Sequence, residues 1–308
     1  NWKAWMNEHT GYSPEKVLSY AEQESGHGSS PHSGKWKSLM EYAKKLTELC
    51  HNHGIKVGVY VGSTFGYEHF LLENPEAKEW IVPDYRGVPV TYYSQLFRKR
   101  PYFMHPGYRK YMKKVLRVAV EDFDVDLIHF DNPANQGVRE VFHHPLAKKH
   151  FKEYLRDKYT PAELKERLGL TDVTYIEPPN YEQSMRTIED PLFQEWTDFR
   201  CQQLADYYGE LADYIRSMDP EVAVENNPHG LAGINTMWEQ SIDFPRILQH
   251  MDFFWTEGEE TTLREDGTLI SKIRTFKMAQ TLDCRVFTYT SGSKLEMAEC
   301  LAYNRQGM

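Results

Sequence analysis

The chain has 308 residues, of which 40% are hydrophobic and 26% charged, and its formal net charge is −9. This length suits one large domain, and the composition is ordinary for a globular protein. No apolar run approaches the ~20 residues that a membrane-spanning helix needs. The acidic balance argues against a polyanionic partner, so we expect neither membrane insertion nor nucleic-acid binding. The oligomeric state is not indicated.

Cysteine spacing and the chain ends give two further expectations. The four cysteines (Cys50, Cys201, Cys284 and Cys300) are widely spaced and form no CxxC pair, which predicts buried free thiols rather than a zinc site or a disulfide framework. The chain starts at Asn1 without a methionine or a signal sequence, and it stops directly after a helical pattern. We therefore expect this sequence to be part of a longer protein, and it contains no targeting segment that would indicate a cellular location.

The predicted elements alternate between helices and short apolar strands. Residues 1–34 are polar and rich in Gly, Ser and His, which indicates a long loop region with a short helical piece. Residues 36–53 show helical spacing that ends at Gly54, and residues 55–61 then form an apolar strand pattern. The same unit recurs with helices at 106–122, 192–218, 245–250 and 271–282, strands at 125–131, 222–225, 252–257 and 285–290, and a last helix at 294–304.

Alternating helices and strands predict a parallel sheet with helical crossovers. Five strands are clear and a weaker one is predicted at 88–93, which makes 125–131 the fourth strand. No glycine-rich GxGxxG turn follows any strand, so the pattern favours an α/β fold of the (β/α)8 TIM-type barrel class over an open doubly wound sheet. We expect one catalytic barrel domain over 1–308, truncated at both ends. A helical insertion at about 138–190 should wall the substrate cleft.

The stretch 124–133 carries the strongest functional signal. Its apolar run ends abruptly at Asp131 and Asn132, as expected for a buried strand that emerges at a polar edge. Because strand side chains alternate, His129 and Asp131 point to one face. Catalytic groups of a parallel barrel lie at the carboxyl ends of its strands, so Asp131 reads as catalytic more readily than as a turn cap.

Two further strand ends carry carboxylates, Glu225 and Glu257. Neighbouring strand tips lie about 5 Å apart, so these side chains can converge over the barrel mouth. Paired carboxylates are the catalytic equipment of glycoside hydrolysis, and the distance between them decides between a retaining and an inverting outcome. The sequence does not give that distance.

The surroundings of each carboxylate indicate a division of labour. Asp131 is the better nucleophile, because Asn132, Asn135 and His129 can stabilise its charge. Glu257 is the better acid/base, because Phe253, Phe254 and Trp255 crowd it with apolar surface. Glu225 competes for the acid role but sits among Asn226, Asn227 and His229, a cluster suited to binding hydroxyl groups. Each carboxylate alone could instead be a cap or an ion-pair partner. We expect no metal or other cofactor.

A carbohydrate substrate is expected to contact aromatic and polar residues near the strand ends. Aromatic faces stack on the C–H faces of sugars, and 14% of this chain is aromatic. The substrate-binding candidates are Tyr60, His105, His129, Asn132, Asn226, Asn227, His229, Trp255 and Tyr289. Plain barrel packing is the alternative for the aromatic members.

The chain resembles glycosyl hydrolase barrels related to α-L-fucosidases and β-galactosidases. The resemblance rests on residues 54–60, on 105–111 leading a helix, and on 124–131, and it spans most of 36–308. It implies a (β/α)8 glycosidase of the kind found in polysaccharide-degrading bacteria and commonly exported. In the fucosidase-like group the fourth-strand carboxylate, matched here by Asp131, is the nucleophile.

The β-galactosidase-like group departs from this chain in one respect. Its fourth strand ends in a Glu after Asn that serves as acid/base, and a second Glu lies on the seventh strand. Here the seventh strand ends in residues 287–291, which contain no carboxylate. This difference disfavours the β-galactosidase arrangement and leaves the stereochemistry open.

Two other readings remain. His129, Asp131 and His229 could serve a metal-dependent hydrolase on the same barrel, since a His-x-Asp pair on one strand face suits two ligands. No His-x-His accompanies the pair, which counts against this reading. The third reading is a non-catalytic carbohydrate-binding barrel, because a fold does not fix a function.

Overall fold

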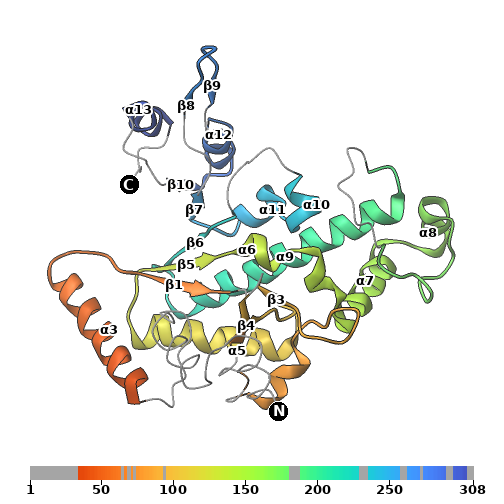
Figure 1. The fold of residues 1–308 in the computed structure, drawn as a ribbon, viewed down its shortest axis with the longest axis horizontal. Helices are drawn as coiled ribbons and strands as arrows, with labels where there is room; N and C mark the ends of the chain where they lie inside the picture. Colours follow the sequence, from red (N-terminus) through yellow and green to blue (C-terminus); the bar gives the residue numbers. More distant parts are fainter. Residues whose placement is uncertain are drawn as a thin grey trace, which may run out of the picture.

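The computed structural model describes residues 34–63, 66–67, 71, 74–92, 95–179, 188–228, 235–256, 262–270, 273–288 and 294–303. Its centre is a parallel sheet of five strands in the order β1-β5-β6-β7-β10 (Figure 1). Their bounds are Gly58–Gly62 (β1), Leu127–Asp131 (β5), Ala223–Asn226 (β6), Phe253–Thr256 (β7) and Arg285–Thr288 (β10). These are the five strands that the sequence predicts clearly.

The weaker strand predicted at 88–93 does not belong to this sheet. Thr91–Tyr92 (β3) pairs antiparallel with Gln95–Lys99 (β4), which also pairs with Gly66–Tyr67 (β2). A parallel pairing needs a crossover of about a dozen residues or more, whereas β4 follows β3 after two residues. A strand is therefore present at 91–92, but the prediction that it joins the parallel sheet was wrong, and β1 is the direct neighbour of β5.

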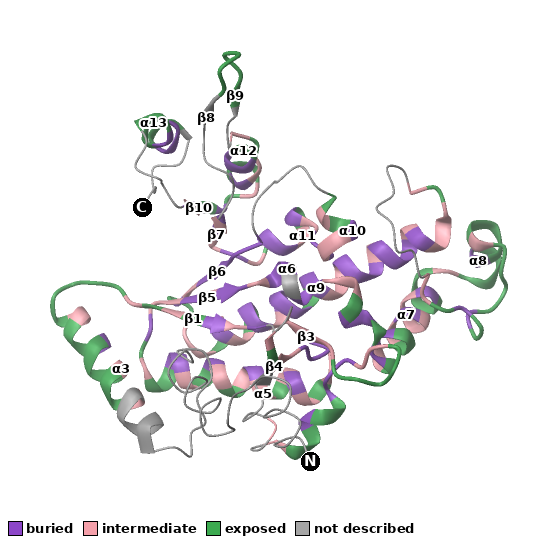
Figure 2. Ribbon diagram, viewed as in Figure 1, coloured by how far each residue is buried: buried purple, intermediate pink, exposed green. Residues whose placement is uncertain are grey.

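Helices alternate with the strands along the chain, and some of them cover one face of the sheet. They are Gly34–Asn52 (α3), Pro106–Arg117 (α5) with the π-helical turn Val118–Asp122 (η2), Pro191–Met218 (α9), Phe244–Leu248 (α11), Ile273–Thr281 (α12) and Lys294–Tyr303 (α13). Ile128, Phe130, Val224 and Phe254 point to the covered face and are fully buried. Phe130 contacts Tyr208 of α9, and Phe254 contacts Phe244 of α11. Figure 2 shows α9 buried along most of its length, whereas the described part of α3 is largely exposed. The core therefore lies between the sheet and α9.

Other elements connect these units. They are Pro75–Glu79 (η1), Pro133–Gln136 (α6), Arg139–His143 (η3), Pro145–Lys158 (α7), Pro161–Leu168 (α8), Thr236–Gln240 (α10) and the antiparallel pair Thr262–Leu263 (β8) and Leu269–Ile270 (β9). Thr160 and Glu163 form a capping box that fixes the start of α8. No described helix is both long enough and apolar enough to cross a membrane.

The helical insertion after β5 contains η3, α7 and α8 in the described residues, as the sequence predicts. Its helices α7 and α8 pack against α9, and Figure 1 shows them to the right of α6. Its residues Arg139, Glu140 and Lys148 line a cavity of about 620 Å³ together with Trp196 and Trp238. In the part of the chain that is described, no insertion residue lines the cavity around Asp131. The lining of this cavity therefore does not support the prediction that the insertion walls the substrate cleft.

A partly buried ion-pair network fixes α7 and α11 on α9. The Asp198 carboxylate accepts hydrogen bonds from the Tyr154 hydroxyl (2.5 Å) and Lys158 Nζ (3.0 Å), and it pairs with Arg246 (2.6 Å). Burial by itself raises the pKa of Asp198, but these partners outweigh burial and lower its pKa to about 2. The network therefore favours the ionised form.

This lowered pKa predicts a pH-dependent contribution to stability. Because the folded pKa lies below the unfolded value, the stabilisation is complete above about pH 4 and is lost as the pH falls towards 2. After allowing for solvent screening, Asp198→Asn should lower the free energy of unfolding by about 1–2 kcal/mol at pH 7. Urea unfolding at pH 7 and pH 3 measures this effect, with Asp213→Asn on the exposed side of α9 as control. An equal loss at both pH values would contradict it.

Candidate active site

Asp131 ends β5, and its side chain points away from the helix-covered face. The strand alternates strictly, so Leu127, His129 and Asp131 share one face while Ile128 and Phe130 pack into the core. Parallel pairing places Tyr60 beside His129 and His129 beside Glu225. Three of the predicted site residues therefore form a row across neighbouring strands, with Asp131 one step nearer the carboxyl edge.

These side chains line one cavity of about 380 Å³. Its lining residues are Gly58, Val59, Tyr60, Leu127, His129, Asp131, Glu225 and Trp255. Tyr60 is 40% exposed and Trp255 is half-buried, so both present aromatic surface to the cavity. The cavity thus combines two carboxylates, one imidazole and two aromatic rings.

Asp131 is 8% exposed, and its carboxylate accepts hydrogen bonds from three side chains. The Tyr60 hydroxyl and the Asn132 side-chain amide donate to Oδ2, and Asn227 Nδ2 donates to Oδ1 at 3.0 Å. Asn132 adopts the left-handed conformation (φ 60°) at the start of α6. Donors to a carboxylate stabilise its charged form and fix its orientation.

His129 lies between the two carboxylates. Its Nδ1 is 2.9 Å from Glu225 Oε2, and its Nε2 is 3.9 Å from Asp131 Oδ1. The ring contacts Tyr60 (centroids 5.2 Å apart) and the edge of Trp255 (5.6 Å). Glu225 itself is 2% exposed. The structure therefore brings together Tyr60, His129, Asp131, Asn132, Glu225, Asn227 and Trp255 among the predicted site residues.

Two other predicted residues lie away from this group. His105 caps α5, where its Nδ1 accepts a hydrogen bond from the Gly107 amide at 3.1 Å, and its ring stacks on Trp80. Asn226 is fully buried on the opposite face of β6 from Glu225. Neither amide atom of Asn226 has a hydrogen-bond partner in the described structure. Neither residue lines the Asp131 cavity.

Glu257, His229 and Tyr289 lie outside the described residues, and so does the side chain of Asn135. Among the residues that are described, no group of three or more His, Cys, Asp or Glu side chains could hold a metal ion. The alternative metal site predicted from the sequence consists of His129, Asp131 and His229. Of these three residues, His229 lies outside the described part of the chain.

Two buried tyrosines that the sequence did not indicate support the backbone at the site. Ser63 Oγ donates to the backbone carbonyl of Asp131 (3.2 Å) and lies 2.7 Å from the Tyr208 hydroxyl. The Tyr108 hydroxyl donates to the Ser63 carbonyl (2.6 Å). Burial raises the pKa of Tyr208, and the nearby Asp131 charge raises it further. Both tyrosines sit on helical apolar faces, where the sequence does not distinguish them from core residues.

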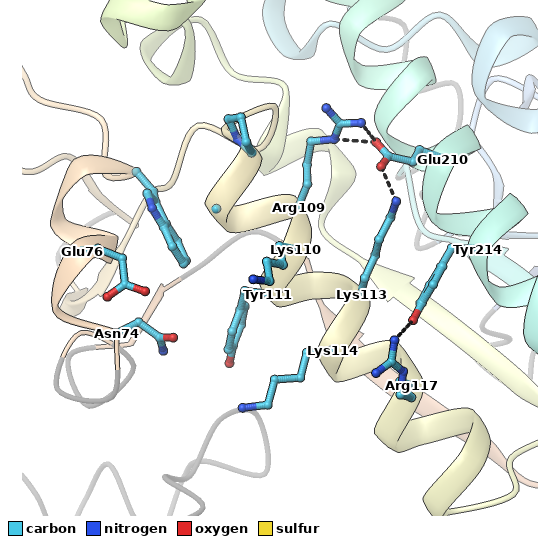
Figure 3. Close-up of a pocket in the computed structure, with 13 residues that line it drawn as sticks. Asn74, Glu76, Arg109, Lys110, Tyr111, Lys113, Lys114, Arg117, Glu210 and Tyr214 are labelled. Atoms are coloured by element: carbon cyan, nitrogen blue, oxygen red, sulfur yellow. Dashed lines mark hydrogen bonds and ion pairs between the residues drawn. The ribbon is translucent and has the colours of Figure 1, made fainter.

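A larger cavity, about 900 Å³, lies elsewhere, along α5 and α9. Figure 3 shows Lys113 and Arg109 reaching Glu210 of α9, while Arg117 contacts Tyr214. Basic residues dominate it, and Glu76 and Glu210 are its carboxylates, of which Glu210 is neutralised by two cations. These basic residues lie on a helix without forming an uninterrupted run, so the sequence did not indicate a basic cluster. The cavity contains no pair of available carboxylates and is not the candidate active site.

The protein has a parallel sheet with helical crossovers, and a carboxylate lies at the carboxyl end of one strand. These features define an α/β barrel protein whose candidate site lies at the carboxyl ends of the strands, where barrel active sites are found. A family model described as β-galactosidase, glycosyl hydrolase family 42, matches residues 79–282, more than half of the chain. The chain belongs to this family. Its fold is therefore a (β/α)8 TIM-type barrel, of which the five parallel strands form part.

Solved structures of β-galactosidases share this fold. The enzyme from Halorubrum lacusprofundi is 17% identical, with a TM-score of 0.58 over 89% of this chain and 41% of its own. The enzyme from Marinomonas ef1 is 15% identical, with a TM-score of 0.57 over 88% and 42%. One from G. stearothermophilus is 18% identical, with a TM-score of 0.54 over 78% and 34%. The chain thus spans less than half of their length. No curated protein matches it in sequence.

Proposed function

We propose that residues 1–308 belong to a single catalytic barrel domain of a glycoside hydrolase that cleaves a glycosidic bond in an oligo- or polysaccharide. Asp131 is its nucleophile and Glu257 its acid/base. The observation that carries this proposal is the Asp131 carboxylate at the edge of β5, held by Tyr60, Asn132 and Asn227 and facing a cavity. Family membership supports the reaction class.

The proposed reaction has two steps. Asp131 attacks the anomeric carbon and forms a glycosyl ester while the acid protonates the departing oxygen. Water then cleaves the ester, with the same second residue acting as base. The donors around Asp131 hold the carboxylate in place before attack and stabilise it again when it leaves. Tyr60 and Trp255 offer aromatic surface for the sugar ring.

The acid role is proposed for Glu257 rather than Glu225. Glu257 directly follows β7 in the sequence, after the apolar residues Phe253, Phe254 and Trp255. Apolar surroundings keep a carboxyl group protonated, as a general acid requires. Glu225 is nearly inaccessible and already contacts His129, so it is poorly placed to protonate a leaving group. This assignment is compatible with a retaining outcome only.

A non-catalytic carbohydrate-binding barrel is the second candidate, and one observation favours it. The family resemblance implies a Glu after Asn at the fourth strand, whereas Pro133, the first residue of α6, follows Asn132 here. The aromatic surface of Tyr60 and Trp255 could bind a sugar without that catalytic glutamate. Turnover separates the two candidates.

Hydrolysis of a panel of aryl glycosides by the full chain tests the proposal, beginning with aryl β-galactosides. We expect release of the aryl alcohol from at least one member. Asp124→Asn serves as control, because Asp124 is an exposed carboxylate near the opposite end of the same strand. Sugar binding without turnover of any member would support the non-catalytic barrel. Activity that chelation removes and zinc restores would support metal-dependent hydrolysis.

Tyr60→Phe tests the contact between the Tyr60 hydroxyl and the proposed nucleophile. The variant keeps the aromatic ring but removes a donor to Asp131 Oδ2. Hydrogen bonds to charged groups contribute about 1.5–3 kcal/mol, so kcat/KM should fall about 10- to 100-fold. Steady-state kinetics measure the effect, and Tyr85→Phe at a 93% exposed tyrosine is the control. Unchanged kinetics would show that the hydroxyl does not support Asp131.

A further inference from the structure

Glu225 is buried at the centre of the site, but only one of its oxygens is engaged. Its side chain is 3% exposed, and Oε2 lies 2.9 Å from His129 Nδ1. Oε1 is buried and has no hydrogen-bond partner in the described structure. A buried carboxylate is costly unless a partner stabilises it. His129 is thus the main partner of Glu225.

The contact fixes the hydrogen on the imidazole ring. An ionised carboxylate can only accept, so Nδ1 must carry the hydrogen that is donated to Oε2. In the neutral ring Nε2 then holds a lone pair. If Glu225 were instead a protonated acid, its proton would lie either on Oε2, donated to Nδ1, or on Oε1, which is buried, and neither position suits transfer to a leaving group. The geometry therefore favours Glu225 as the residue that orients His129 over Glu225 as the catalytic acid.

The remaining contacts hold the ring in one orientation. Tyr60 packs against it at 5.2 Å with an angle of 30° between the ring planes, and Trp255 meets it nearly perpendicularly. Nε2 then faces the Asp131 side, 3.9 Å from Oδ1, which is too long for a direct hydrogen bond. Both groups line the same cavity. A ligand hydroxyl beside Asp131 can therefore donate to Nε2.

We propose that Glu225 is a positioning residue that fixes the tautomer and orientation of His129, whose Nε2 accepts a hydrogen bond from a hydroxyl of the sugar attacked by Asp131. This inference rests on the proposed glycosidase function. It assigns the paired carboxylate and imidazole to substrate recognition and leaves protonation of the leaving group to another residue. The ligand class is a neutral sugar with a hydroxyl near the reacting carbon.

Two substitutions of Glu225 separate positioning from acid catalysis. Glu225→Gln keeps a carbonyl acceptor for Nδ1–H but cannot supply a proton, whereas Glu225→Leu removes the acceptor. We expect kcat/KM for an activated aryl glycoside to stay within about threefold in Glu225→Gln and to fall about 10- to 100-fold in Glu225→Leu, as for other residues that orient a functional histidine. In a His129→Leu background, Glu225→Leu should cause no further loss. Equal, large losses in both Glu225 variants would overturn the proposal.

Proton NMR of the full chain tests the same contact without any activity. We expect a downfield Nδ1–H signal that His129→Leu removes, that Glu225→Gln retains and that Glu225→Leu loses. A His129 ring that carries its hydrogen on Nε2 alone would overturn the inference even in an active enzyme. An intact Nδ1–H signal in a protein that hydrolyses no glycoside would instead refute the proposed function. Should Glu225→Leu not fold, the Glu225→Gln kinetics and the wild-type spectrum still decide.

Discussion

Asp131→Ala should abolish hydrolysis of aryl glycosides, with a loss in kcat of at least about 10⁴-fold, because no covalent intermediate can form without the nucleophile. The site should otherwise persist, since Tyr60 and Asn227, which donate to Asp131, are held by β1 and by the chain directly after β6. Steady-state kinetics with an activated aryl glycoside measure the loss. Asp124→Asn, which changes an exposed carboxylate, should keep wild-type rates.

Azide provides a second measurement on the same variant. A small anion can occupy the space left by the Asp131 carboxylate and attack the anomeric carbon directly. The product should be a glycosyl azide of inverted configuration, because a single displacement replaces two. Nuclear magnetic resonance identifies its anomeric configuration. Substantial residual hydrolysis by Asp131→Ala without azide would contradict the nucleophile assignment.

Glu257→Ala should produce a loss that depends on the leaving group. A natural oligosaccharide needs protonation of its departing oxygen, so its hydrolysis should fall about 10²- to 10⁴-fold. An activated aryl glycoside needs no proton, so glycosylation of the enzyme should proceed nearly normally. Azide should then accelerate the deglycosylation that lacks a base. Pre-steady-state and steady-state kinetics on both substrates separate the two steps.

Glu225→Ala is the comparison for Glu257→Ala. We expect Glu225→Ala to lower kcat/KM for activated and natural substrates by similar factors, because misplacing His129 does not depend on the leaving group. If the leaving-group dependence appears in Glu225→Ala and not in Glu257→Ala, the acid belongs to β6. That result would also remove the positioning role proposed for Glu225. If neither variant shows it, the proposed mechanism is wrong.

The fold was predictable from the sequence because its signals are local. Helical spacing ending at Gly54 and the apolar run into Asp131 each arise within one element, and the structure places α3 and β5 there. The strand predicted at 88–93 was assigned to the wrong sheet, because a short apolar run does not reveal its pairing partner. Its pairing with β4 depends on a nearby chain reversal and not on a helical crossover.

The site was predictable only in part, because some of its contacts arise within one strand and others depend on how distant elements pack. Alternation along one strand puts His129 and Asp131 on one face, and this is visible in the sequence. The pairing of His129 with Glu225 depends on the register between β5 and β6, whose residues lie 96 positions apart in the chain. The support of Ser63 by Tyr108 and Tyr208 likewise depends on how α5 and α9 pack.

Covalent trapping tests the central claim, that Asp131 is the nucleophile, most directly. The full chain is incubated with an activated 2-deoxy-2-fluoro glycoside of the sugar that it hydrolyses fastest, then digested and examined by peptide mass spectrometry. Because fluorine at carbon 2 slows breakdown of the glycosyl ester, the label should accumulate. We predict one equivalent of label on the peptide containing Asp131 and none in Asp131→Ala. A label on Glu225 or Glu257 would contradict the account.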